Sequence, residues 1–114
     1  MPLLKIHTNQ TLDPNKQTEL LSAASTEVAN LLGKSEKYVM VILEAQQPLL
    51  FGGTTEPAAY LELKSLGLPQ EQTATLSSGL CHLIQQQLDI PGERIYIEFS
   101  DAARHMWGWN GGTF

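Results

Sequence analysis

The order of secondary-structure elements is the feature that most limits how this chain can fold. Hydrophobic spacing predicts a strand, a helix and a strand, then a loop over 46–57, and then the same order again. The expected elements are a strand over 3–8, a helix from 13 to 33, a strand over 38–43, a strand over 58–66, a helix between 67 and 89 and a strand over 94–99. The chain therefore contains two strand–helix–strand units.

Local signals support these elements. In the first strand Leu4 and Ile6 fall on one face, while Lys5 lies on the other. Asp13 is a suitable N-terminal cap for the first helix, and Gly33 suits its end because glycine tolerates the left-handed conformation. The run over 38–43 is nearly all apolar, which is typical of a central strand covered on both faces.

Two strand–helix–strand units predict an α/β (α+β) fold in one domain over residues 1–114. Each unit should be a right-handed crossover with parallel strands. The two halves correspond at a shift of 57 residues: Glu36-Lys37 aligns with Glu93-Arg94, and each pair lies just before a strand. Side by side, the units give a four-stranded mixed sheet with both helices on one face. We expect partner subunits to cover the other face, where each buried Leu, Ile or Val would contribute ~1.5–3 kcal/mol.

Composition excludes several functions. The net charge of −5 leaves no basic stripe for nucleic acid. No apolar run reaches the ~20 residues of a membrane helix, and we expect no signal peptide and a cytoplasmic location, which leaves non-classical secretion open. Cys81 is the only cysteine, so no intramolecular disulfide is expected. The three histidines lack metal-ligand spacing, so no metal site is expected.

Pro2 is the first candidate for chemistry. Cells commonly remove an initiator methionine that precedes proline, which would leave a free secondary amine at the start of a strand. Such an amine can act as a general base or a nucleophile if its pKa lies near neutral. The alternative is that Pro2 simply begins a strand, where its missing N–H costs nothing.

Short motifs in every segment strengthen the first interpretation. They are Pro2, Gly33-Lys34, Phe51-Gly52-Gly53-Thr54-Thr55-Glu56-Pro57, Ser65-Leu66-Gly67, Arg94-Ile95-Tyr96-Ile97, Gly108-Trp109-Asn110 and Thr113-Phe114. Over its whole length the chain resembles the macrophage migration inhibitory factor family of the tautomerase superfamily. The resemblance implies a homotrimer whose three sheets form a central barrel, with active sites between subunits. It also implies keto–enol tautomerase activity on phenylpyruvate-like aromatic 2-oxo acids, with dopachrome-like compounds as further candidates and no cofactor.

The resemblance also implies roles for individual residues. Pro2 would be the catalytic base, Lys34 would hold the substrate carboxylate and lower the pKa of the amine, and the backbone N–H of Leu66 would bond substrate oxygen. Tyr96 of a neighbouring subunit would lie close to Pro2. Four aromatic residues would shape the slot for the substrate ring: Tyr38, Trp107, Trp109 and Phe114.

Each residue also has a purely structural explanation. Lys34 is a common residue at a helix C-terminus, where its charge complements the dipole. Tyr96 alternates with isoleucines and could serve packing. Tryptophans often anchor a core or a subunit interface. The alternative function is a cytokine-like binding protein of the same fold, with a vestigial site.

The sequence departs from the family pattern at three places. Ala58 and Leu61 stand where mammalian members carry a CxxC pair, so thiol–disulfide chemistry should be absent. Glu98 replaces an asparagine that contacts substrate and would place a carboxylate near an anion site. Trp107 replaces a smaller aliphatic residue at the rim. These last two changes bear on substrate range rather than on the base.

Overall fold

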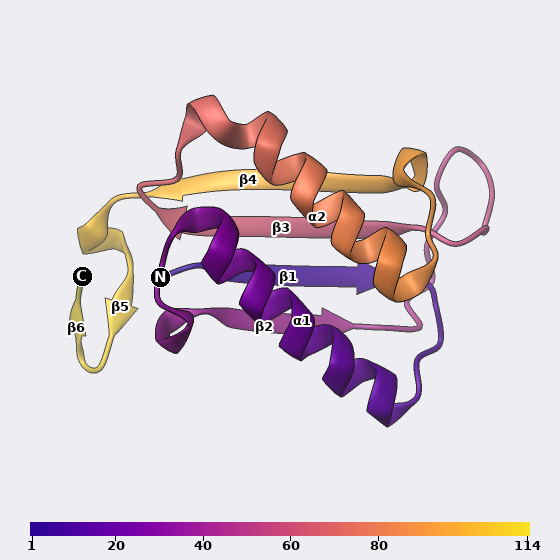
Figure 1. The fold of residues 1–114 in the computed structure, drawn as a ribbon, viewed down its shortest axis with the longest axis horizontal. Coiled ribbons are helices and arrows are strands. Elements are labelled where there is room, and N and C mark those ends of the chain that lie inside the picture. Colours follow the sequence, from indigo (N-terminus) through magenta and orange to yellow (C-terminus); the bar gives the residue numbers. More distant parts are fainter.

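The computed structural model describes residues 1–114 and contains a four-stranded sheet, two long helices and a short C-terminal hairpin (Figure 1). Four short 3-10 helices lie between these elements. The bounds are β1 Leu3–Thr8, α1 Pro14–Leu32, β2 Met40–Glu44, β3 Ala59–Leu66, α2 Thr73–Leu88, β4 Ile95–Ala102, β5 Gly108–Trp109 and β6 Gly112–Thr113. The 3-10 helices span Glu36–Tyr38, Gln70–Gln72, Gly92–Arg94 and Arg104–Met106.

The sheet is mixed, as the sequence predicts. Its strand order is β2-β1-β3-β4; β1 is parallel to β2, β3 is parallel to β4, and β1 and β3 are antiparallel. Each strand–helix–strand unit therefore contributes one parallel pair, and the antiparallel pair joins the two units. Two short 3-10 helices, Glu36–Tyr38 and Gly92–Arg94, precede the corresponding strands β2 and β4.

Both helices cover one face of the sheet (Figure 1), and the core lies between them and the strands. The helix-facing positions of β1 and β3 are almost fully buried, and so is one side of each helix. The expected caps of α1 are present: the Asp13 carboxylate accepts a hydrogen bond from Lys16 N at 2.8 Å, and Gly33 has φ +63°. No helix is long and apolar enough to cross a membrane.

Two predictions about the sheet are wrong. β2 is an edge strand rather than a central one, and Met40 is 60% exposed. An apolar run shows that both faces of a strand are apolar, but it does not show how many neighbours the strand has. The predicted strand also begins too early, because Tyr38 ends a 3-10 helix and β2 begins at Met40.

The open face of the sheet is largely polar. Successive rows across the strands are Glu44–His7–Tyr60–Tyr96, Ile42–Lys5–Glu62–Glu98 and Met40–Leu3–Lys64–Ser100. His7 Nδ1 lies 2.9 Å from the Glu44 carboxylate, and Lys64 Nζ lies 3.7 Å from that of Glu62. Of the Leu, Ile and Val side chains that a partner subunit would bury on this face, these rows contain only Leu3 and Ile42.

Gly79 of α2 has no space for a side chain on the side that faces α1. A Cβ atom at this position would lie 2.8 Å from Cδ2 of Leu31 in α1. Such a distance is too short for carbon atoms, so any side chain here must displace Leu31. Glycine thus allows the helices to pack closely over the sheet.

We expect Gly79→Val to lower the free energy of unfolding by about 1–3 kcal/mol, because overpacking forces the helices apart. Gly79→Ala should cost less, since the methyl groups of Leu31 can move and alanine favours a helix by about 1 kcal/mol. Urea unfolding followed by circular dichroism at fixed protein concentration measures both. Ser78→Val, on the exposed side of α2, is the control. Equal stability of Gly79→Val and Ser78→Val would contradict this account.

Candidate functional site

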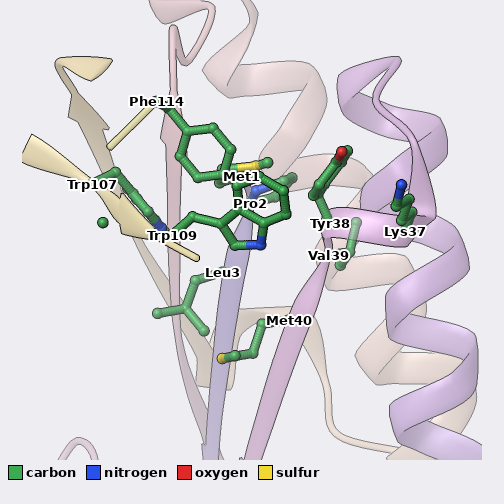
Figure 2. A pocket seen from close by; sticks show the side chains of 11 residues that line it. Met1, Pro2, Leu3, Lys37, Tyr38, Val39, Met40, Trp107, Trp109 and Phe114 are labelled. Carbon is green, nitrogen blue, oxygen red and sulfur yellow. The ribbon is translucent and has the colours of Figure 1, made fainter. Parts of the chain in front are cut away.

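An apolar hollow surrounds the start of β1 (Figure 2). Its volume is about 490 Å³. Eleven residues line it, drawn from the N-terminus, the segment before and into β2, and the C-terminal tail: Met1, Pro2, Leu3, Lys37, Tyr38, Val39, Met40, Trp107, Gly108, Trp109 and Phe114. Pro2 is buried, and its carbonyl oxygen accepts a hydrogen bond from Met40 N at 3.0 Å. The pairing with β2 thus fixes Pro2 in the hollow.

The C-terminal tail folds into a hairpin that supplies the aromatic wall. Asn110 and Gly111 both have positive φ values, 51° and 81°, between the paired strands β5 and β6. This is the conformation that an Asn-Gly pair favours in a tight hairpin. Phe114 N donates to Trp107 O at 3.2 Å, so the chain end folds back over the hairpin.

The aromatic side chains contact one another across the hollow. The rings of Trp109 and Phe114 stack with centroids 5.4 Å apart. Tyr38 meets Trp109 edge-on at 5.6 Å and Phe114 at 6.3 Å. Offset and edge-to-face arrangements of this kind are the favourable ones for aromatic pairs. The result is an aromatic slot next to Pro2.

A second, more polar hollow adjoins the first. It has a volume of about 400 Å³ and is lined by Met1, Lys34, Leu66, Gly67, Arg104 and Phe114. Lys34 follows the left-handed Gly33 at the end of α1, and its Nζ donates to Leu66 O at 2.9 Å. Arg104 Nε donates to Phe114 O at 3.4 Å. Two cations therefore face one small hollow.

Met1 and Phe114 line both hollows. Figure 2 shows the Met1 and Pro2 side chains beside the rings of Phe114 and Trp109. Burial lowers the pKa of the Met1 amino group, and the nearby Lys34 charge lowers it further. An amine at this position therefore loses its proton more easily than an ordinary one.

The structure brings together most of the residues that the sequence singled out. Pro2, Tyr38, Trp107, Trp109 and Phe114 line the aromatic hollow, and Lys34 and Leu66 line the cationic one.

Tyr96 and Glu98 do not join these residues within one chain. Both lie on the open face of β4; Tyr96 is 66% exposed and lines a third hollow of about 390 Å³ with Leu50 and Phe51. The Glu98 carboxylate accepts a hydrogen bond from the Tyr60 hydroxyl at 3.3 Å. Burial raises the pKa of Tyr60, and the carboxylates of Glu62 and Glu98 raise it further, which keeps this donor protonated.

Sequence reasoning did not assign Arg104 to the site. It lies in the 3-10 helix Arg104–Met106, directly before Trp107, and neither its spacing nor its neighbours in sequence indicate that it lines the same hollow as Lys34. The only available signal was its position in the tail that carries the tryptophans.

Arg94 holds the loop that supports Tyr96. Its guanidinium donates four hydrogen bonds to carbonyl oxygens of the loop, at Phe51 (3.1 Å), Thr54 (3.4 Å), Glu56 (3.0 Å) and Pro57 (2.9 Å). It also lies 5.0 Å from the ring centroid of Phe51, whose ring is 4.7 Å from that of Tyr96. Arg94 thus fixes the aromatic pair of the third hollow.

Comparison with known proteins identifies the family. The sequence model of the macrophage migration inhibitory factor family matches residues 1–114. A homologue of that factor from Trichuris trichiura is 37% identical over 115 residues, covering all of both chains, and the factor of Xenopus laevis is 35% identical over 100% of this chain and 99% of its own. The crystal structure of a homologue from Prochlorococcus marinus superimposes with a TM-score of 0.91 at 43% identity over 98% of each chain.

The chain belongs to the macrophage migration inhibitory factor family. The resemblance seen in the sequence is confirmed, and so is the mixed sheet with two helices on one face. Membership in this family supports, in general terms, an isomerase of the tautomerase superfamily and a cytokine-like function. It does not name a substrate.

In this family member we expect Arg94→Ala to release the 51–57 loop, because four hydrogen bonds and a cation–ring contact are lost. Protection of the loop amides against hydrogen exchange should fall, while protection of α1 should stay the same. Arg94→Lys should give an intermediate result, since a lysine cannot serve four carbonyl oxygens at once. Unchanged exchange over 51–57 in Arg94→Ala would show that other contacts hold the loop.

Proposed function

We propose that this chain is a keto–enol tautomerase for phenylpyruvate-like aromatic 2-oxo acids, with the Pro2 nitrogen as general base once Met1 is removed. The observation that carries the proposal is the position of Pro2, buried beside an aromatic slot and next to a hollow with two cations. An aromatic 2-oxo acid has a ring for the slot and a carboxylate for the cations. Dopachrome-like acids share both features.

The reaction needs a base that is neutral at physiological pH. The Pro2 amine would take a proton from the carbon next to the substrate carbonyl. The protonated amine, directly or through solvent, would then give a proton to the enolate oxygen, which forms the enol and restores the neutral amine. Burial disfavours a protonated amine, and so does a nearby cation. The same two causes lower the pKa of the Met1 amino group in this region, which supports a lowered pKa for the Pro2 amine.

Lys34 would hold the substrate carboxylate. Its ammonium has three donors, and one of them is bonded to Leu66 O, so donors remain for a ligand. Tyr38, Trp109 and Phe114 would contact the substrate ring. We also propose that the backbone N–H of Leu66 donates a hydrogen bond to a substrate oxygen.

We propose a homotrimer that completes each site. Tyr96 and Leu50 are 66% and 69% exposed on the open side of the sheet, and monomers rarely leave such side chains grouped in water. Covered by a neighbour, Tyr96 would lie close to the Pro2 of that neighbour, and Glu98 would lie near its substrate. Residues 1–114 would form one domain of each subunit.

The alternative is a cytokine-like binding protein that uses the same fold with a vestigial site. The names of the relatives, which describe a macrophage migration inhibitory factor, support this alternative. A chain that lacks turnover with Met1 removed would favour the alternative.

The pH dependence of kcat/KM for phenylpyruvate tests the base in protein freed of Met1. Activity should rise as the pH passes the pKa of the Pro2 amine from below, because only the neutral amine accepts a proton. Lys34→Ala removes a charge that disfavours the protonated amine, so the pKa of the Pro2 amine should rise. The acidic side of the pH profile of kcat/KM should then move to higher pH. Lys16→Ala, at the far end of α1, is the control and should leave the profile unchanged.

Blocking the Pro2 nitrogen gives the sharper test of the same mechanism. Protein that keeps Met1, or whose Pro2 nitrogen is acetylated, has an amide in place of the amine and should lose on the order of 10²–10⁴-fold in activity. Pro2→Ala leaves a primary amine and should retain part of it. Equal activity with and without Met1 would overturn Pro2 as the base.

Native mass spectrometry and sedimentation velocity at about 10 µM test the assembly. We expect three subunits in the wild-type chain. Leu50→Asp should favour the monomer, because an unpaired carboxylate would be buried at the interface. Ala74→Asp, exposed on the helical side, is the control and should remain trimeric. A wild-type monomer at this concentration would refute the trimer.

A further inference from the structure

Lys34 and Arg104 line the same small hollow of this acidic chain. Of the seven Lys and Arg residues, only Lys16 and Lys64 pair with an Asp or Glu carboxylate. The ion pairs in the structure join His7 to Glu44, Lys16 to Glu19 and Lys64 to Glu62. Neither cation of the second hollow pairs with an Asp or Glu carboxylate. Two like charges therefore line one small space, where the oxygen bonded to Arg104 belongs to Phe114, the last residue of the sequence.

The Arg104 guanidinium has unused donors. Only Nε is bonded, to Phe114 O at 3.4 Å, and neither terminal nitrogen has a hydrogen-bond partner in the protein. A guanidinium presents five N–H donors in a planar fork that matches a carboxylate. Most of this fork is therefore available to a ligand.

The backbone fixes Arg104 beside the aromatic slot. Trp107 N donates to Arg104 O at 3.3 Å and closes the 3-10 turn that carries both residues. Phe114, which accepts the Arg104 Nε bond, lines the aromatic hollow and the cationic one. A molecule with its ring in the slot would thus present its other end to Lys34 and Arg104.

We propose that Arg104 is a second anion-binding residue that, together with Lys34, holds the carboxylate of the aromatic 2-oxo acid. This inference rests on the proposed function, since it assigns a specificity residue to the same site. Charge-assisted bonds from two different cations bind a carboxylate more strongly than one. They also offset the repulsion from Glu98, the carboxylate expected near the substrate. The site therefore selects free acids and discriminates against their esters.

Binding of phenylglyoxylate tests the role of Arg104 apart from turnover. This aromatic 2-oxo acid has no hydrogen on the atom next to its keto group and cannot enolise. In protein freed of Met1, calorimetry should give a Kd that rises on the order of 10- to 100-fold in Arg104→Ala, because bonds to a charged group are lost. Arg104→Lys keeps the charge without the fork and should fall between. The methyl ester should bind equally to wild type and Arg104→Ala.

Steady-state kinetics with phenylpyruvate provide a second test of Arg104. Arg104→Ala should raise KM with little change in kcat, as expected when a group binds substrate and transition state equally. Lys16→Ala removes one positive charge far from the site and should change neither constant. Near-ultraviolet circular dichroism of Trp107 and Trp109 checks that the tail stays folded in each variant.

The outcomes separate the two proposals. Wild-type protein that binds phenylglyoxylate through Arg104 but does not turn over phenylpyruvate would overturn the tautomerase function and keep Arg104 as an anion-binding residue. An unchanged Kd in Arg104→Ala, or equal losses for acid and ester, would overturn the role of Arg104. So would a wild-type chain with no affinity for phenylglyoxylate.

Discussion

The antiparallel pairing of β1 with β3 is the interaction on which the rest of the structure depends. It joins the two strand–helix–strand units, and its pairs Leu4–Leu63 and Ile6–Leu61 are fully buried at the centre of the core. The register also places the site. Because Leu3 pairs with Lys64, the residues before Leu3 run along the end of β3, where Met1 and Leu66 line one hollow. A shift of one residue in this register would turn these buried side chains to the open face. The shift is unfavourable because the core would lose them.

The two faces of the sheet serve different purposes. On the helical face apolar side chains supply the burial that stabilises the fold. On the open face neighbouring strands satisfy each other's polar groups: His7 Nδ1 contacts the Glu44 carboxylate, and the Tyr60 hydroxyl donates to the Glu98 carboxylate. Polar groups that are already bonded within one chain gain little from burial between subunits. Apolar contact between subunits would therefore come from the margins of this face, where Leu50 is exposed beside Tyr96.

The sequence predicts the helices and strands well, but it predicts less well which strands lie next to each other in the sheet. Alternation and caps identify β1, β3 and α1, because these signals are local and the same side chains that produce them are buried. The edge position of β2 depends on pairing between distant segments, which an apolar run does not encode. An Asn110-Gly111 pair is a known hairpin signal, but the flanking Trp109 and Gly112 do not alternate in hydrophobicity, and the hairpin was missed. Arg104 could not be assigned from sequence, since its proximity to Lys34 requires both the sheet register and the hairpin.

Met1 connects the chemistry of the site with the processing of the chain. While it is present, the Pro2 nitrogen is an amide, and the Met1 side chain fills space that belongs to both hollows. Its removal would create the base and open the wall between the aromatic slot and the two cations in one step, without movement of a strand. The free amine would then belong to Pro2, beside the aromatic slot. Burial and the Lys34 charge, the two causes that lower the pKa of the Met1 amino group, should also lower the pKa of the Pro2 amine. Loss of a single residue would then supply the base, its lowered pKa and the space for the substrate together.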